Sequence, residues 1–382
     1  MKRTVTKNSF DIYYTPCNWR ENLCIDKLIE KFVNAYGEEN ISLNEFDISI
    51  QRYPRHSLGR HNSVIVQHTA TRKWALWDTG VCSETRNPSF LWGILDYRNY
   101  LLPYHSFPAR DMIMYCSLKS PTEEFPHPEE LTEYSWPKLP WAGQTTKFDD
   151  IDRAYEQNYD ALPYVVFRGH PWSQFSEKHP AQPRGRLPFM NHLVDISKSR
   201  NLKEIVVSGG DIHHNMESLP DPSTYLSRRK FVEEIARSSG CISLPGGADV
   251  SNRDYETAGV GRAVIRPPYV VGIWGEDDPD HPFLYSTPCL KAFETKQERK
   301  ENWWGFYIDY LDDDLIRQSC EDMVESALEL IADKEKQKAM RVKARAWFEK
   351  YTTPDNIAQY LFDSMKKAFD ADLEKWKLLK HL

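Results

Sequence analysis

The stretch CISLPGGADVSNRDYETAGVGRAVIRPPY, residues 241–269, decides the fold. It opens with a short apolar run, CISL, which is typical of a buried strand. The glycine-rich turn PGGAD follows, and then Ser251 or Asn252, either of which can cap a helix. Gly259 or Gly261 can end that helix, after which RAVI resumes as a second apolar strand. The pattern predicts a βαβ unit whose turn and helix N-terminus can hold an anion.

Composition bounds the kind of protein that surrounds this unit. The chain has 382 residues, of which 40% are hydrophobic, so we expect two globular domains with cores of their own. The formal net charge is −7 and no long basic stripe occurs, which argues against a nucleic-acid groove. The seven cysteines are scattered without zinc-site spacing, so we expect neither a disulfide framework nor a metal cluster.

The N-terminal residues and the hydropathy predict the compartment. MKRTVTKNSFDIYYTP lacks an apolar run long enough for a signal peptide, and no window reaches membrane-spanning length. We therefore expect a cytoplasmic protein without a membrane span.

Strand-like and helical segments alternate along the whole chain, which predicts an α/β fold. Strands are expected at residues 10–14, 63–68, 73–77, 164–167 and 204–208, and helices at 22–36, 149–159, 187–197, 227–236, 312–333 and 334–350.

Three motifs in a fixed order resemble the donor-site signature of family-90 glycosyltransferases, the capsule-associated and protein O-glucosyl- and xylosyltransferase type. The first is VVFRG, followed by Arg184 and Arg186. The second is LPGGADVSNRDYETAGVGRAVI, in which Gly246, Ser251 and Arg253 match the signature. The third is the aromatic WWGFYIDYL with the later RAWFEKYTT. The resemblance covers about residues 160–365, and Pro245 stands where the family usually has an acidic residue.

The resemblance implies a GT-B fold, in which two Rossmann-like domains face each other across a cleft. Residues 1–160 would form the acceptor domain and 161–350 the donor domain, with 351–382 a helix returning toward the N-terminal domain. The implied reaction is an inverting, metal-independent transfer of a sugar such as xylose or glucose. The donor would be a nucleoside-diphosphate sugar, of the UDP-linked kind, and the acceptor a hydroxyl of a glycan or glycoprotein. No cofactor beyond this co-substrate is expected.

The residues expected to bind the donor surround the two glycine turns. They are Arg168, Gly169, Arg184, Arg186, Gly246, Gly247, Ser251, Arg253, Glu256 and Arg262. Arg253 would neutralise the diphosphate. Glu256, three residues later on the same helix face, could accept hydrogen bonds from ribose or sugar hydroxyls. The alternative for these two is a surface ion pair near a helix start. Arg168 ends a strand at a glycine, where we favour phosphate binding; the rival role is a structural bridge to a C-terminal carboxylate.

An inverting transfer needs a base for the acceptor hydroxyl. The resemblance favours Asp96, whereas position at the end of a strand favours Asp78. Asp211 and His213 follow a strand in the other half of the chain. The neighbouring His214 does not make a metal site with His213, because adjacent side chains on a regular element point different ways.

Two other functions remain open from the sequence. One is another nucleotide-sugar enzyme on a similar fold, such as an epimerase. The other is a catalytically inactive glycan-binding or scaffold protein. Substitution of Arg253 would separate an enzyme, which should lose donor affinity, from a scaffold, which should keep its partner.

Overall fold

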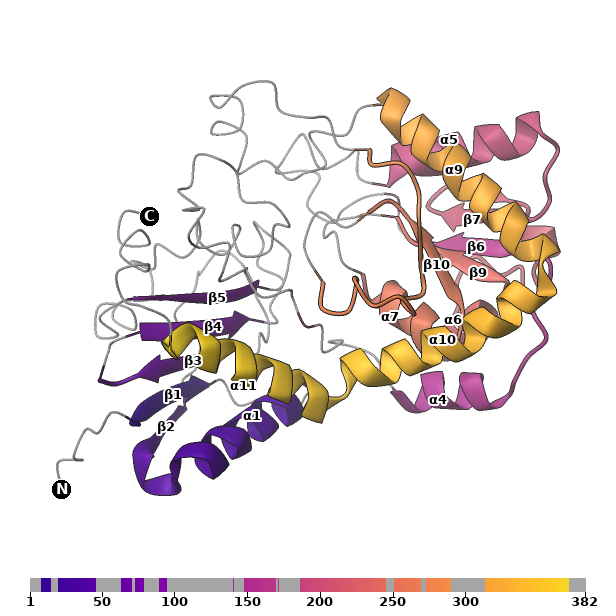
Figure 1. Ribbon diagram of the computed structural model, residues 1–382. Coiled ribbons are helices and arrows are strands. Elements are labelled where there is room, and N and C mark those ends of the chain that lie inside the picture. The colour runs from indigo at the N-terminus through magenta and orange to yellow at the C-terminus, as the bar shows by residue number, and fades with distance from the viewer. Residues whose placement is uncertain are drawn as a thin grey trace.

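A computed structural model of the chain describes residues 8–14, 20–45, 63–70, 73–78, 89–94, 140, 148–169, 171, 186–244, 251–268, 273–289 and 313–370. These residues form an α/β protein with one six-stranded and one five-stranded sheet (Figure 1).

The six-stranded sheet belongs to the second half of the chain, and its order is β11-β10-β9-β6-β7-β8. All its neighbouring strands are parallel except the β7–β8 hairpin. The strands are β6 (Val165–Arg168), β7 (Ile205–Gly209), β8 (Ile212–His214), β9 (Gly240–Ile242), β10 (Ala263–Arg266) and β11 (Phe283–Tyr285).

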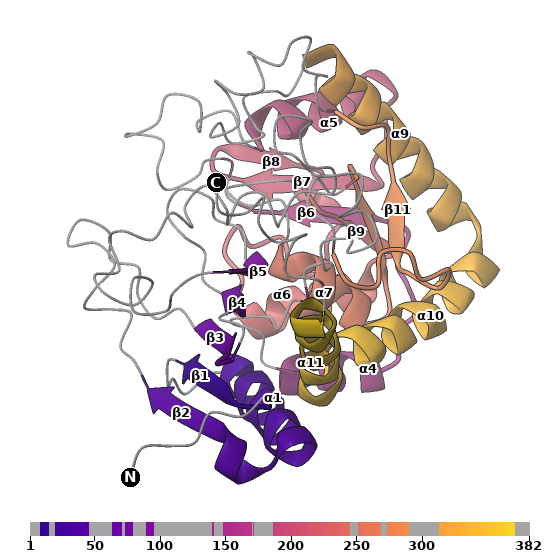
Figure 2. The ribbon, with the colours of Figure 1, turned by 60° about the vertical axis from the view of Figure 1, so that its left-hand side comes forward.

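Both faces of this sheet are covered by helices, as the apolar character of its strands requires. Alternate residues of each strand point to opposite faces, so Val165 and Phe167 lie in one core and Val166 in the other. The first face packs on α5 (Leu187–Ser199) and α9 (Asp313–Ala332). The opposite face is covered by α4 (Phe148–Glu156), α6 (Arg228–Arg237), α7 (Asn252–Gly259) and α10 (Lys334–Thr352), as Figure 2 shows from the side.

The predicted βαβ unit is confirmed as β9-α7-β10, whose two strands are parallel neighbours. The helix ends at Gly259, and Gly261 has a φ of +76°, in the left-handed region that glycine adopts without strain. The chain can therefore reverse direction within three residues and enter β10.

The order of the strands defines where a ligand would bind. From β6 the chain passes through α5 to β7 on one side, and later returns through α6 to β9 on the other side. In open α/β sheets the ligand crevice lies at such a switch point, outside the carboxyl ends of the strands. The carboxyl ends of β6 and β9 therefore mark the candidate site.

The five-stranded sheet lies in the N-terminal part, with the order β2-β1-β3-β4-β5. Its strands are β1 (Phe10–Tyr14), β2 (Ile41–Glu45), β3 (Ser63–His68), β4 (Lys73–Asp78) and β5 (Ser89–Ile94). Two helices share its core: α1 (Arg20–Tyr36), followed by the short η1 (Glu38–Asn40), and the C-terminal α11 (Pro354–Asp370). The last described helix thus packs against the first described strand and helix of the chain (Figure 1).

The N-terminal sheet differs from the Rossmann-like domain predicted for residues 1–160. Only β1 and β2 are parallel, whereas the β1–β3, β3–β4 and β4–β5 pairs are antiparallel. A Rossmann-like domain is built on a mostly parallel sheet, which needs long crossover connections. The strands at 63–68 and 73–78 are instead separated by only four residues, and so short a connection joins antiparallel strands.

None of the helices in the described ranges combines the length and the apolar character needed to cross a membrane.

Candidate functional site

The helix of the βαβ unit begins at a reciprocal hydrogen-bonded cap. Ser251 Oγ accepts the backbone N–H of Arg253 at 3.2 Å, and the backbone N–H of Ser251 donates to Asp254 Oδ2 at 3.0 Å. The same Oδ2 accepts Nη1 of Arg266 at 2.5 Å, and both members of this ion pair are buried. The cap is therefore held by the next strand, which fixes the first turn of α7 and the point from which Arg253 projects.

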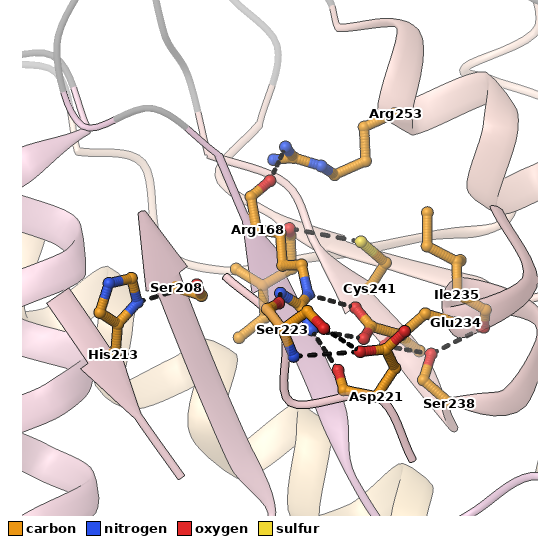
Figure 3. Close-up of polar contacts among 12 residues, drawn as sticks. Arg168, Ser208, His213, Asp221, Ser223, Glu234, Ile235, Ser238, Cys241 and Arg253 are labelled. Carbon is orange, nitrogen blue, oxygen red and sulfur yellow. Dashed lines mark hydrogen bonds and ion pairs between the residues drawn. The ribbon is translucent and has the colours of Figure 1, made fainter. Parts of the chain in front are cut away.

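Arg253 reaches from α7 across the carboxyl ends of the central strands toward β6 (Figure 3). Its Nη2 donates to the carbonyl oxygen of Arg168, and its guanidinium carbon lies 4.7 Å from the centroid of the Phe167 ring. The residue is only 8% exposed, yet Nε and Nη1 have no hydrogen-bond partner among the described residues. A buried donor without a partner is costly, so these two nitrogens are suited to an anionic ligand.

A second arginine approaches the same place from the residue before α5. Arg186 Nε donates to the carbonyl oxygen of Leu244, just beyond β9, at 3.3 Å, and the guanidinium carbon lies 5.9 Å from the Phe167 ring. A Cβ added at Gly169 would lie 2.9 Å from Arg253 Nη2 and 3.2 Å from Arg186 Nη1. Gly169 therefore lets two guanidinium groups converge at the switch point between β6 and β9.

Glu256 lies one turn after Arg253 and is 4% exposed. It forms an ion pair with Nη2 of Arg228, from the first turn of α6. Burial raises the pKa of the Glu256 carboxyl, while the positive charges of Arg228 and Arg253 oppose that rise. The ion-pair alternative for Glu256 is thus present in the structure, as a partly buried pair that links α6 to α7 beside the site.

Arg168 corrects the sequence analysis, which favoured phosphate binding for this residue. Its Nε and Nη2 donate to the two carboxylate oxygens of Glu234 at 2.6 and 2.7 Å. Nη1 donates to the carbonyl oxygen of Ser223 at 2.6 Å, and Nη2 to that of Asp221 at 2.9 Å (Figure 3). The guanidinium is occupied by the protein itself, because its side chain points to the α6 face and not beyond the strand end. The geometry favours the structural ion pair.

Arg262 also differs from its predicted place in the donor site. It precedes β10, at the amino end of the sheet and so at the edge opposite the switch point. Its Nε donates to the carbonyl oxygen of Ala236 at 2.9 Å, and Nη2 to that of Tyr159 at 2.8 Å. Burial is the main cause that lowers its pKa to about 10. Arg262 therefore joins the end of α6 to the segment before β6.

Several predicted residues cannot be placed at the site. Asp96, Arg184, Gly246 and Gly247 lie outside the described residues, and of Asp78 the structure shows only that it ends β4.

The β7–β8 hairpin carries the other candidate base. His213 Nδ1 lies 3.2 Å from Ser208 Oγ, and Asp211 is in the turn. His214 points elsewhere, with Nε2 2.9 Å from Ser197 Oγ. No group of three potential metal ligands occurs among the residues that the structure describes.

The sequence analysis assigned no role to two aromatic residues of the site, Phe167, which it quoted only within the VVFRG motif, and Phe231. Phe167 lies beneath both guanidinium groups, and Phe231 of α6 lies 5.7 Å from the guanidinium carbon of Arg253. An aromatic face attracts a cation, so the two rings help to hold a guanidinium in place. The available signal was the position of Phe167 at the end of an apolar strand that leads to a glycine.

The chain was also compared with protein-family models, with curated proteins and with solved structures, and none of the three comparisons finds a match.

Proposed function

We propose that the protein is a glycosyltransferase that moves a sugar from a nucleoside-diphosphate sugar to a hydroxyl group of a glycan or protein. The observation that carries the proposal is Arg253, buried at the switch point of a parallel sheet with two nitrogens unpartnered among the described residues. Arg186 adds a second guanidinium beside Gly169. In such a crevice, a diphosphate would receive charge-assisted hydrogen bonds from groups that are already in position.

The proposed reaction uses this positive charge on the leaving group. The acceptor oxygen attacks the anomeric carbon while the bond from that carbon to the diphosphate oxygen breaks, and the electron pair of the broken bond stays on the diphosphate. A base takes the proton of the acceptor hydroxyl, and the configuration at the anomeric carbon inverts. Asp96 and Asp78 remain the proposed bases. Arg253 and Arg186 would stabilise the negative charge that grows on the diphosphate as the bond breaks.

The test begins with binding and ends with turnover. Thermal unfolding is measured against a panel of nucleoside diphosphates and their sugars, with EDTA present throughout. A ligand at a hundred times its Kd should add about 2.7 kcal/mol to the free energy of unfolding. The sugar nucleotide that binds is then incubated with glycan and peptide acceptors, and release of the nucleoside diphosphate is followed.

The proposal expects one nucleotide family to stabilise the wild-type protein but not the Arg253→Met variant. It also expects the sugar nucleotide of that family to be turned over. Binding without turnover on any acceptor would favour the inactive, glycan-binding alternative. No stabilisation by any nucleotide would overturn the donor site itself.

A further inference from the structure

The loop between β8 and α6 is fixed beside the site by Arg168. This guanidinium donates to the carbonyl oxygens of Asp221 and Ser223. Asp221 Oδ1 in turn accepts the backbone N–H of Ser223 at 3.1 Å, and Asp221 Oδ2 accepts Nζ of Lys230 at 2.8 Å. The contacts with Arg168 tie residues 221–223 to the carboxyl end of β6 (Figure 3), and the contact with Lys230 ties them to the first turn of α6.

The same loop is fixed again at its other end. Ser227 caps α6 by accepting the backbone N–H of Lys230, and the next residue, Arg228, forms an ion pair with Glu256. Glu256 lies one turn from Arg253 on α7. Both ends of the loop therefore lie at the edge of the sheet where Arg253 has its unpartnered nitrogens.

Tyr225 lies between these two fixed ends and is 94% exposed. It is two residues from Ser223 and three from Arg228, so its Cα lies at most about 7 Å and about 11 Å from theirs. Among the large apolar and aromatic residues that the structure describes, the next most exposed is Val342, at 65%. A highly exposed ring therefore lies on a loop whose two ends are tied beside the carboxyl ends of the central strands.

We propose that Tyr225 is the platform on which the base of the nucleotide stacks while the diphosphate binds Arg253. This inference rests on the proposed nucleotide site, and it deepens that proposal by assigning the group that recognises the base. A tyrosine ring suits this task because every nucleobase offers an aromatic face, and stacking needs no further hydrogen bond. The loop that carries the ring is held at both ends before the ligand arrives, so little backbone freedom is lost on binding.

The test compares two probes that differ in the base. Uridine diphosphate carries both the base and the two phosphates, whereas inorganic pyrophosphate carries only the phosphates. Affinities are measured by calorimetric titration for uridine diphosphate, and by competition against it for pyrophosphate. The proteins are the wild type, Tyr225→Ala, Tyr225→Phe and Arg253→Met, with Val342→Ala as an exposed control on α10. All three positions are described, and substitutions at the two exposed ones, Tyr225 and Val342, should change stability little.

The expected result separates the ring from the charge. Tyr225→Ala should weaken the binding of uridine diphosphate by about tenfold or more, because one stacked base is lost. It should leave the affinity for pyrophosphate within about twofold of the wild type. Tyr225→Phe and Val342→Ala should bind both probes like the wild type, and Arg253→Met should weaken both.

Two results would overturn the assignment of Tyr225 while leaving the anion site intact. One is an equal loss of affinity for both probes in Tyr225→Ala, and the other is no loss of affinity for either probe. If the wild type binds neither probe, the proposed nucleotide site fails, and the assignment of Tyr225 fails with it.

Discussion

Arg168 and Arg253 are equally buried, each 8% exposed, but the structure gives them opposite energetic roles. The decisive perturbation replaces each in turn by methionine, which is long and apolar and carries no charge. Arg168 has a carboxylate and two carbonyl oxygens around its guanidinium. Arg253 has one carbonyl oxygen, and two of its nitrogens lack a partner among the described residues.

The magnitudes follow from these contacts. Arg168→Met leaves Glu234 buried without its counter-charge, and breaking a buried pair in this way costs about 3–5 kcal/mol. Arg253→Met loses one charge-assisted hydrogen bond, about 1.5–3 kcal/mol, and contacts with the Phe167 and Phe231 rings, about 0.5–2 kcal/mol each. It also removes two buried donors without partners, which relieves about 1–3 kcal/mol each. These contributions nearly cancel, so we expect the free energy of unfolding to change by no more than about 1 kcal/mol.

Urea unfolding of the two variants and the wild type, without nucleotide, measures this difference. Both residues contact β6, so the same transition of the six-stranded sheet reports on both. We expect Arg168→Met to lower the midpoint strongly and Arg253→Met to leave it almost unchanged. Equal and large losses in the two variants would refute the reasoning, because Arg253 would then be a structural arginine rather than one kept for a ligand.

Three further predictions concern Gly169, the Ser251 cap of α7, and His214 on the edge strand β8. Gly169→Ala should weaken nucleotide binding, because its Cβ would lie 2.9 Å from Arg253 Nη2 and 3.0 Å from Phe167 Cζ. Gly209→Ala, whose Cβ would lie 1.8 Å from the Gly169 carbonyl oxygen, should destabilise the fold more than Gly169→Ala does in the same urea assay. Ser251→Ala should cost about 1 kcal/mol of stability in chemical unfolding, and Ser251→Asp, which also caps a helix, should restore most of it; equal stability of all three proteins would contradict the cap. Burial lowers the pKa of His214, so the stability that neutral His214 contributes above its ordinary pKa of about 6.5 is lost as the pH falls through the lowered pKa. Between pH 7.5 and pH 5.5, the free energy of unfolding should therefore decrease less in His214→Gln than in the wild type. An equal decrease in the two proteins would show that His214 is not the cause.

The local elements were predictable from the sequence because local patterns determine them. The strands at 10–14 and 63–68 have the predicted bounds, and the helices at 313–332 and 334–352 lie within two residues of theirs. The βαβ unit was predicted for the same reason, because a glycine turn, a serine cap and a second apolar run all occur within the 29 residues of the stretch 241–269. Each of these signals is contained in one short segment.

The roles of the arginines could not be predicted, because their partners are remote in the chain. Nothing near Arg168 indicates that Glu234, 66 residues later, occupies its guanidinium. Arg262 likewise contacts Tyr159, 103 residues before it. Sequence spacing placed Arg253 and Glu256 on one helix correctly, but it could not show that Arg228 pairs with the glutamate. The prediction of a Rossmann-like, mostly parallel N-terminal sheet was wrong for a similar reason, because strand pairing depends on connections that hydrophobic periodicity does not report.

The most direct test of the central claim is a calorimetric titration of uridine diphosphate into the wild-type protein and into Arg253→Met. The account predicts saturable binding to the wild type and a loss of at least about a hundredfold in the variant, as expected when a charge-assisted contact to a diphosphate is removed. The variant should meanwhile remain as stable as the wild type. Equal affinity of the two proteins would contradict the claim that the buried guanidinium of Arg253 forms the anion site.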